Sequence, residues 1–364
     1  MDQAMHFNQS MEENGTTVSR DLTAQTSWVQ SLEDTYFRVR PGFSGAFVGT
    51  GCFGIIGNIL ILIVFTKMGF SNTIHMSYSA LAVSDLCCVL ASMVYGNTAM
   101  DVVRRSVNEQ TSYRLSNMFG GLPHLCFSRV TALLTAWISL ERCLCVKFPT
   151  RVKLMITSTV TKVVILAIFL LGCLPMVFVY IAYRFEWQPD PRTNSSTLNL
   201  VYDERLGVAE TFLILLGVVY PVVSWVTVTF CTSVLVLQLR QSYKWRKSNT
   251  QGAEVSPAGN HAVTANQSQQ QKSTKENHVT KVVVMVAVVF LLCSVPVSAN
   301  ILADLIIPEY SIDGTLRYLN LINGMINVLF TELNSSLNVV VFSVSGQKFR
   351  SVLFEILSKG PCKK

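Results

Sequence analysis

The chain has 364 residues, of which 50% are hydrophobic and only 14% are charged. Its mean hydropathy of +0.40 argues against an ordinary soluble domain, in which charged residues cover the surface. The formal net charge of +7 could suggest a nucleic-acid partner. The placement of the basic residues, described below, explains it instead by orientation in a membrane, so no nucleic-acid partner is predicted.

Seven apolar runs follow one another along the chain. Each is near the ~20 residues needed to cross a ~30 Å hydrocarbon core. They are expected to be helices, because a helix satisfies its own backbone hydrogen bonds in lipid. The sequence therefore predicts an all-α membrane protein, a seven-transmembrane helix bundle. The expected spans are 43–66, 73–96, 120–146, 158–183, 206–238, 280–307 and 316–344.

The segments outside the spans differ in character. Residues 1–42 form a polar N-terminal tail without the apolar centre of a cleavable signal peptide, so the first helix is expected to direct insertion. The receptor domain is expected over 43–346. Within it, residues 240–279 form a third intracellular loop that is polar, of low complexity and predicted to be disordered. Residues 347–364 are expected to form a short amphipathic helix on the inner leaflet and a cytoplasmic tail.

Lysine and arginine set the expected orientation. With the N-terminus outside, all 13 lysines lie on the cytoplasmic side, as the positive-inside rule requires. Three glycosylation sequons then fall outside the cell, beginning at Asn8, Asn14 and Asn194. We expect a multi-pass plasma-membrane protein in contact with membrane lipid.

The ten cysteines avoid every predicted extracellular loop, so no structural disulfide is expected. Most of them are explained as small buried apolar side chains. Cys362 follows the amphipathic stretch at the C-terminus and is a candidate for palmitoylation.

Short motifs occur on successive helices. Asn58 lies in "GNIL", Asp85 in "LAVSDL" and Glu141-Arg142 in "SLERCLCVKFP"; "CSVP" and "NSSLNVVVF" follow on the last two helices. In this order they resemble the rhodopsin-like (class A) G-protein-coupled receptors over about residues 43–358. "LAVSDLCC" and "SLERCLCVKFP" are most similar to mollusc chemosensory-type receptors. Neuropeptide receptors share much of the pattern and remain the alternative.

Several positions depart from the family pattern. The family usually joins the top of helix three to the second extracellular loop by a disulfide. Here the matching position is Asn117, and the loop 184–205 has no cysteine. Val339 and Phe342 replace the usual proline and tyrosine of helix seven, and Ser294 replaces the tryptophan before the helix-six proline.

The resemblance implies a heterotrimeric G protein as the cytoplasmic partner, bound near Arg142. At rest, Glu141 is expected to neutralise Arg142 locally. Glu276 lies where related receptors carry the acid of an ionic lock between helices three and six. The alternative is that Glu276 is only a solvated charge at a helix end.

Asp85 is expected to be buried in mid-membrane, where an ionisable group usually marks function. By resemblance, the polar positions around it could hold a sodium ion and waters, and the alternative is a hydrated network without sodium. No other metal or cofactor is predicted. The positions expected around Asp85 are Asn58, Thr131, Asn334, Ser335 and Asn338.

A ligand site is expected in the outer half of the bundle. His124 occupies the position where amine receptors carry an aspartate, so a simple biogenic amine is disfavoured. Arg129 lies below His124, and Glu332 is expected to approach His124 from helix seven. Their alternative role is mutual pairing for structure. Tyr95, Ser294 and Asn323 are expected to add polar contacts with a small-molecule or peptide ligand from outside.

Other function classes are excluded or disfavoured. The sequence shows no nucleophile–base pair, metal cluster or phosphate loop, so an enzyme is not expected. It also lacks the inverted repeat of a typical transporter. Opsins need a lysine in helix seven for retinal, and residues 316–344 contain none.

Overall fold

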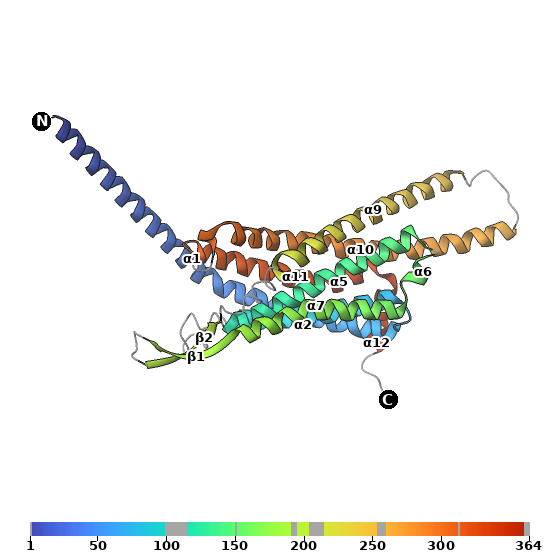
Figure 1. Ribbon diagram of the computed structural model, residues 1–364. Helices are drawn as coiled ribbons and strands as arrows, with labels where there is room; N and C mark the ends of the chain where they lie inside the picture. The colour runs from blue at the N-terminus through green and yellow to red at the C-terminus, as the bar shows by residue number, and fades with distance from the viewer. Residues whose placement is uncertain are drawn as a thin grey trace.

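The computed structural model describes residues 2–98, 115–149, 151–190, 195–203, 215–252, 260–311 and 314–359. It describes the backbone alone over most of 2–26, 195–200, 245–252 and 260–278. Seven long helices lie side by side as a bundle (Figure 1), which confirms the predicted fold class. These helices are α1 (Asp2–Met68), α2 (Thr73–Thr98), α5 (Leu122–Lys147), α7 (Ser158–Ala182), α9 (Tyr220–Gly252), α10 (Asn260–Ile306) and α11 (Arg317–Ser345).

Shorter elements connect or extend these helices. π-Helical turns η1 (Asn117–Gly121) and η2 (Leu215–Val219) precede α5 and α9. The short helix α6 (Val152–Met155) joins α5 to α7, and η4 (Pro308–Tyr310) lies between α10 and α11. The last helix is α12 (Gln347–Lys359).

Among the described residues, six of the long helices are long and apolar enough to cross a membrane. The seventh bundle helix, α5, carries the polar residues His124 and Arg129 within its apolar stretch. It can do so because it lies inside the bundle, in contact with α2, α7, α9 and α10. In α7, by contrast, only 17% of the most apolar stretch is buried inside the bundle. That stretch is therefore available to lipid.

Helix α1 begins far earlier than the first expected span and projects beyond the bundle (Figure 1). The hydropathy pattern indicates only the part that faces lipid, whereas the helix continues through the polar segment before it. Part of this extension packs on α11. The Tyr318 hydroxyl donates to Glu33 Oε1 over 2.7 Å, and the Tyr36 and Tyr318 ring centroids are 5.7 Å apart.

The structure also differs from the predicted disorder over 240–279. Helix α9 continues to Gly252, and α10 begins at Asn260, so most of this segment is helical. Residues 253–259 lie outside the described part of the chain. Extending an existing helix avoids the cost of nucleation, and the Gln, Lys, Glu and Ala residues of this segment are good helix formers. The prediction of disorder rested on polarity and low complexity, neither of which excludes the extension of a neighbouring helix.

The main hydrophobic core lies toward the end of the bundle where α12 turns across it. The rings of Phe65, Tyr78, Phe342 and Phe349 contact one another there, with centroids 4.7–5.6 Å apart. Phe349 is 3% exposed, so the apolar face of α12 packs at least in part on the bundle, while the predicted position on the inner leaflet stays a prediction. An added Cβ at Gly57 of α1 would lie 2.7 Å from Val339 Cγ1, so only glycine allows α1 and α11 to approach this closely.

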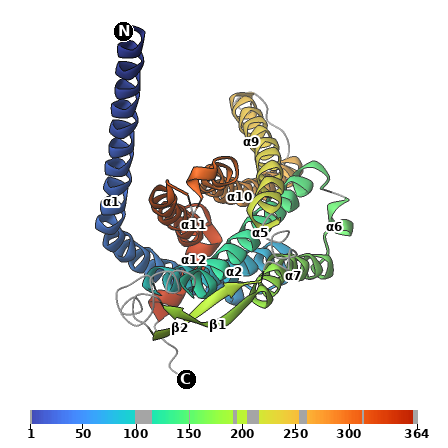
Figure 2. The ribbon, with the colours of Figure 1, turned by 60° about the vertical axis from the view of Figure 1, so that its left-hand side comes forward.

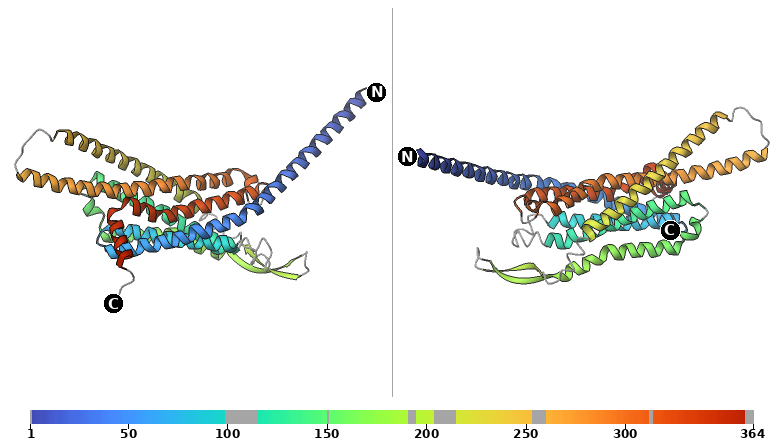
Figure 3. Two further views of the ribbon diagram at one scale, coloured as in Figure 1. Left: turned by 180° about the vertical axis from the view of Figure 1, so that it is seen from behind. Right: turned by 45° about the horizontal axis from the view of Figure 1, so that its top comes forward.

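The second extracellular loop contains a β-hairpin that was not predicted. Strands β1 (Tyr183–Asp190) and β2 (Ser195–Tyr202) pair antiparallel, with Tyr183 opposite Tyr202. The hairpin continues outward from the end of α7, at the opposite end of the bundle from α12 (Figure 3). Its main contact with a helix is with α7. It does not fold across the ends of α10 and α11 (Figure 2).

Candidate functional site

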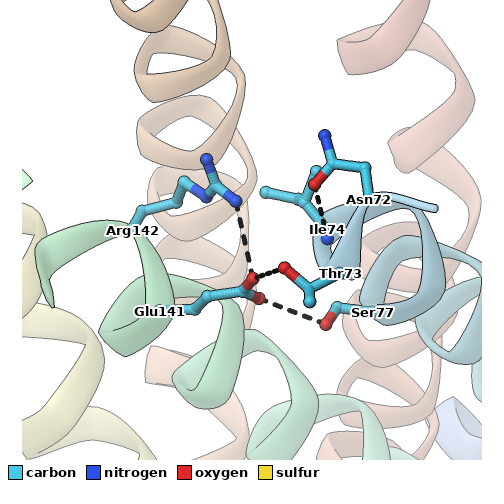
Figure 4. Close-up of polar contacts among 6 residues, drawn as sticks. All are labelled: Asn72, Thr73, Ile74, Ser77, Glu141 and Arg142. Atoms are coloured by element: carbon cyan, nitrogen blue, oxygen red, sulfur yellow. Dashed lines mark hydrogen bonds and ion pairs between the residues drawn. The ribbon is translucent and has the colours of Figure 1, made fainter. Parts of the chain in front are cut away.

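The cytoplasmic end of α5 holds the predicted arginine and its acid (Figure 4). Arg142 Nη2 lies 3.5 Å from Glu141 Oε1, and the Glu141 side chain has no exposed surface. Two hydroxyls at the start of α2 complete the site. Thr73 donates to Glu141 Oε1 over 2.5 Å, and Ser77 donates to Oε2 over 3.3 Å. Glu141 is therefore held by α2 as well as by Arg142.

No motif in the sequence marks the two hydroxyls as partners of Glu141. Thr73 and Ser77 are four residues apart on α2, so they share one helical face. That spacing is the sequence feature that could have identified them as a pair. Glu276, the other predicted partner of Arg142, lies in α10, but its side chain is outside the described residues.

A second polar site surrounds Asp85 of α2, which is completely buried. Thr131 of α5 donates to Asp85 Oδ1 over 2.8 Å, and Asn338 of α11 donates to Oδ2 over 2.7 Å. The Ser84 hydroxyl extends this network, at 3.0 Å from that of Thr131. The carboxylate thus connects three helices, and two of its predicted neighbours bind it directly.

The other predicted members of the Asp85 site are nearby in the bundle but differ in role. Asn58 of α1 donates to the carbonyls of Gly54 and Ser335, over 2.9 and 3.0 Å. Asn334 and Ser335 are both buried. Asn58 therefore joins α1 to α11 and does not donate to Asp85.

The donor set at Asp85 is compatible with a hard cation such as sodium. Carboxylate and hydroxyl oxygens are the ligands that such a cation prefers. Each Asp85 oxygen accepts one of the two bonds above, and among the described residues neither forms an ion pair. Asn58 Oδ1 is a further buried oxygen without a hydrogen-bond partner. Asp85 would hold the ion, which would balance its charge.

The predicted outer site contains His124, Arg129 and Glu332, and all three are buried. His124 contacts α2, with Nδ1 3.4 Å from the Cys88 carbonyl oxygen and 3.5 Å from its sulfur. Arg129 Nε has no hydrogen-bond partner, and within the described chain no carboxylate forms an ion pair with this guanidinium. Cys88 lies within electrostatic range of both Arg129 and Glu332.

No described hydrogen bond joins Glu332 to His124, so the expected approach of the two is not supported. Glu332 is directed toward α1 and α2 instead, and an added Cβ at Gly51 would lie 2.9 Å from its Oε1. Neither carboxylate oxygen has a hydrogen-bond partner. The nearby hydroxyls of Thr50 and Ser92 donate to carbonyls of their own helices. The absence of a side chain at Gly51 leaves room for Glu332 on this side, away from His124.

The three further residues predicted for the ligand site are placed differently. Ser294 donates to the Phe290 carbonyl of its own helix, and the Tyr95 carbonyl accepts a bond from Ser116 over 3.0 Å. Asn323 lies near the outer end of α11, where it donates to the Tyr310 hydroxyl over 2.8 Å. None of these bonds involves Arg129, so a shared ligand site for the four residues stays a prediction.

Tyr310 of η4 forms a clasp between α10 and α11 that the sequence analysis missed. Its hydroxyl donates to Asn300 of α10 and accepts from Asn323 of α11. Asn320 donates to the Tyr310 carbonyl over 2.6 Å and to Asp304 over 2.8 Å. Burial raises the pKa of Tyr310 above its usual value, so the hydroxyl keeps its proton.

An open apolar hollow of about 480 Å³ lies elsewhere, against α2 and α7 near their cytoplasmic ends. It contains none of the predicted ligand residues. Its lining is Phe70, Met76, Ala80, Lys162, Ile165, Leu166 and Phe169.

The remaining predicted modification sites cannot be placed. Asn194 and Cys362 lie outside the described residues. The side chains of Asn8 and Asn14 are likewise not described. The nine cysteines that the structure describes are free.

Comparison with known proteins matches residues 57–338 to the 7 transmembrane receptor (rhodopsin family). Growth hormone secretagogue receptor type 1 of rabbit is 24% identical over 96% of this chain and 92% of its own. The human receptor of the same name is 24% identical over 91% of this chain and 86% of its own. The crystal structure of squid rhodopsin has the same fold, with a TM-score of 0.59 at 15% identity, covering 88% of this chain and 86% of that chain.

Proposed function

This chain belongs to the rhodopsin family of seven-transmembrane receptors, and we propose that its ligand is an extracellular peptide with an acidic group. As a member of this family it is a multi-pass plasma-membrane receptor that signals through heterotrimeric G proteins. We place its N-terminus outside, on the distribution of its lysines.

The sequence leaves two classes of ligand open, a chemosensory substance and a neuropeptide. The relatives favour the second. Proteins named as growth hormone secretagogue receptors match this chain over 84–96% of its length. Such a name describes a response to an internal signalling substance. The chemosensory reading rests on short motifs alone.

Arg129 is the observation that indicates an acidic group on the ligand. Its guanidinium keeps its charge under all ordinary conditions. It is buried in α5, and among the described residues it has no carboxylate partner. An unbalanced buried charge is costly, and a ligand carboxylate would remove that cost through a bidentate pair. Glu332 does not compete for Arg129, because it is directed toward α1 and α2.

The test is a ligand screen in cells that express the chain with promiscuous G proteins. The panel should contain peptides with free and amidated C-termini, together with odorant-like small molecules. We expect peptides with a free carboxylate to activate the receptor. Activation by the small molecules alone would support the chemosensory role instead.

Arg129→Gln then tests the residue. A charge-assisted hydrogen bond contributes about 1.5–3 kcal/mol, so the potency of an acidic ligand should fall roughly ten- to a hundredfold. Glu332→Gln is the matched control and should have a smaller effect. If both variants reach the surface and lose potency equally, Arg129 and Glu332 act as one structural pair, and the proposed carboxylate contact is incorrect.

A further inference from the structure

The β1–β2 hairpin exposes an apolar surface. Phe185 and Trp187 of β1 are 51% and 71% exposed. They are two residues apart, so they lie on the same face of the strand, and exposed Glu186 lies on the other. The strand register places Leu200 opposite Phe185 and Leu198 opposite Trp187. A two-stranded hairpin is marginally stable by itself, so this apolar surface calls for a partner.

The hairpin is not tied to the top of α5. The cysteine pair that usually makes this connection is missing, because Asn117 and a loop without cysteine replace it. The contacts that fix the hairpin are at its base. Asp203 N donates to the Ala182 carbonyl over 2.8 Å, and Arg184 pairs with Asp203. Among the described residues, the main helix contact of the hairpin is with α7, so its outer part is left for a partner outside the bundle.

The surface of α7 indicates what the partner is. Leu170, Leu174 and Ile181 are 60%, 48% and 62% exposed, at helical spacing along the lipid-facing side of α7. The chain passes directly from Ala182 into β1, so Phe185 follows the lipid-facing row by four residues. The hairpin continues α7 outward on this side of the bundle (Figures 1 and 3). The exposed apolar surface of the hairpin is thus continuous with the lipid-facing surface.

Residue type and distance agree with this continuity. Tryptophan and tyrosine concentrate at membrane–water interfaces, where an amphipathic ring suits the headgroup region. At about 3.3 Å per residue, Phe185 and Trp187 are about 10 and 17 Å of strand beyond Ala182. A hairpin that leans toward the bilayer brings both rings to headgroup level. We propose that the apolar face of the β1–β2 hairpin docks on the outer leaflet of the membrane, with Phe185 and Trp187 as its anchors.

This docking would replace the missing disulfide as the interaction that holds the hairpin in place. It would fix the hairpin on the α7 side of the bundle and keep it away from the ends of α10 and α11. The entrance for an extracellular ligand would then stay open. The inference does not depend on which ligand binds.

The test uses single cysteines at Trp187→Cys and, as the matched control on the opposite face, Glu186→Cys. Both are labelled in intact cells with a membrane-impermeant environment-sensitive maleimide dye. The unsubstituted chain should remain unlabelled, because no extracellular loop has a cysteine. The labelled receptors are transferred to phosphatidylcholine nanodiscs, with or without lipid that carries a doxyl quencher near its headgroup.

We expect the dye at 187 to emit at a shorter wavelength than the dye at 186. It should be quenched strongly by the doxyl lipid and only weakly by aqueous iodide. The dye at 186 should be quenched strongly by iodide and only weakly by the doxyl lipid.

Equal iodide quenching at both positions would show a free hairpin and overturn the proposal. Protection of 187 from both quenchers would show packing on protein and overturn it too. Absence of labelling at both positions would place the hairpin away from the cell exterior, with the same result. Phe185→Cys provides a second position, expected to match 187, if Trp187→Cys fails to reach the surface.

Discussion

Glu141 is completely buried, and its three described polar contacts all restrain the cytoplasmic end of α5. Two of these contacts come from α2, so the acid does more than neutralise Arg142. It also fixes α5 against α2. Arg142 Nε remains without a hydrogen-bond partner, although its side chain is only 16% exposed. Among the described side chains, Glu141 is therefore the one polar contact of the arginine, which becomes available for a new partner when that contact breaks.

Thr73→Val should raise signalling in the absence of ligand. The change keeps the side-chain shape but removes the hydroxyl that donates to Glu141 Oε1. A hydrogen bond to a charged group contributes about 1.5–3 kcal/mol, so loss of this restraint should increase basal activity several-fold. The measurement is G-protein activation at equal surface expression. Thr227→Val is the control, since that exposed hydroxyl bonds only its own helix. Equal basal activity in the two variants would show that Thr73 does not restrain Arg142.

Asp85 should make the stability of the receptor depend on sodium. A ligand that binds only the folded protein stabilises it by RT ln(1 + [L]/Kd), or about 1.4 kcal/mol when its concentration is ten times Kd. The melting temperature of the solubilised receptor should therefore be higher in sodium chloride than in choline chloride. Asp85→Asn should abolish the difference. A wild-type receptor with the same melting temperature in both salts would favour the sodium-free hydrated network.

The sequence predicted site residues better than it predicted their contacts. Asp85 and Asn338 could be found because each lies in a motif, and Thr131 because it occupies a matching family position on its helix. The partners of Glu332 and His124 could not, because they depend on the direction of each side chain. Gly51 lets Glu332 lie toward α1, and Cys88 receives His124. Gly51 belongs to no motif, and the motif "LAVSDLCC" that contains Cys88 does not mark it as a partner of His124.

At the scale of elements, the apolar runs predicted all seven bundle helices but not their full lengths. Hydropathy reports the lipid-facing part of a helix, so it missed the polar extensions of α1, α9 and α10. The hairpin was missed for another reason. Its signal is the alternation of Tyr183, Phe185 and Trp187, which extends over too short a stretch to distinguish a strand from a loop.

Two interactions hold α12, and we expect the one at Phe349 to be strong and the one at Glu355 to be weak. Phe349→Ala removes a ring that is 3% exposed and packed against Phe65 and Phe342. Such a change costs about 3–5 kcal/mol. Glu355→Ala removes a partner of Lys67, but both side chains are more than 40% exposed, so the loss should be about 0–1 kcal/mol.

Thermal unfolding of the solubilised receptor measures both. We expect a clearly lower melting temperature for Phe349→Ala and almost no change for Glu355→Ala. If Glu355→Ala were the more destabilising change, the ion pair between α1 and α12 would be the main anchor, and the buried ring would be secondary.

At the scale of the whole molecule, packing and hydrogen bonds hold the extracellular end together in the part of the chain that the structure describes. The clasp of Tyr310 joins α10 to α11, and the contact of Tyr318 with Glu33 joins α11 to α1. The nine described cysteines are free, and Cys126 of α5, the one nearest in sequence to the usual bridging position at Asn117, is completely buried.

The receptor should therefore tolerate a membrane-impermeant reductant. A disulfide typically contributes 2–4 kcal/mol, mainly by restricting the unfolded chain, and a receptor that relies on one loses ligand binding when it is reduced. Here no extracellular cysteine is available to form such a bridge, so surface expression and ligand response should be unchanged under reductant. A receptor that carries the usual extracellular bridge, treated in the same cells, shows that the reductant is active. Loss of response in this chain would mean that two of its cysteines pair, with Cys126 as one candidate. Retained response would show that the outer end does not depend on a disulfide, as expected if contacts such as those of Tyr310 and Tyr318 hold it.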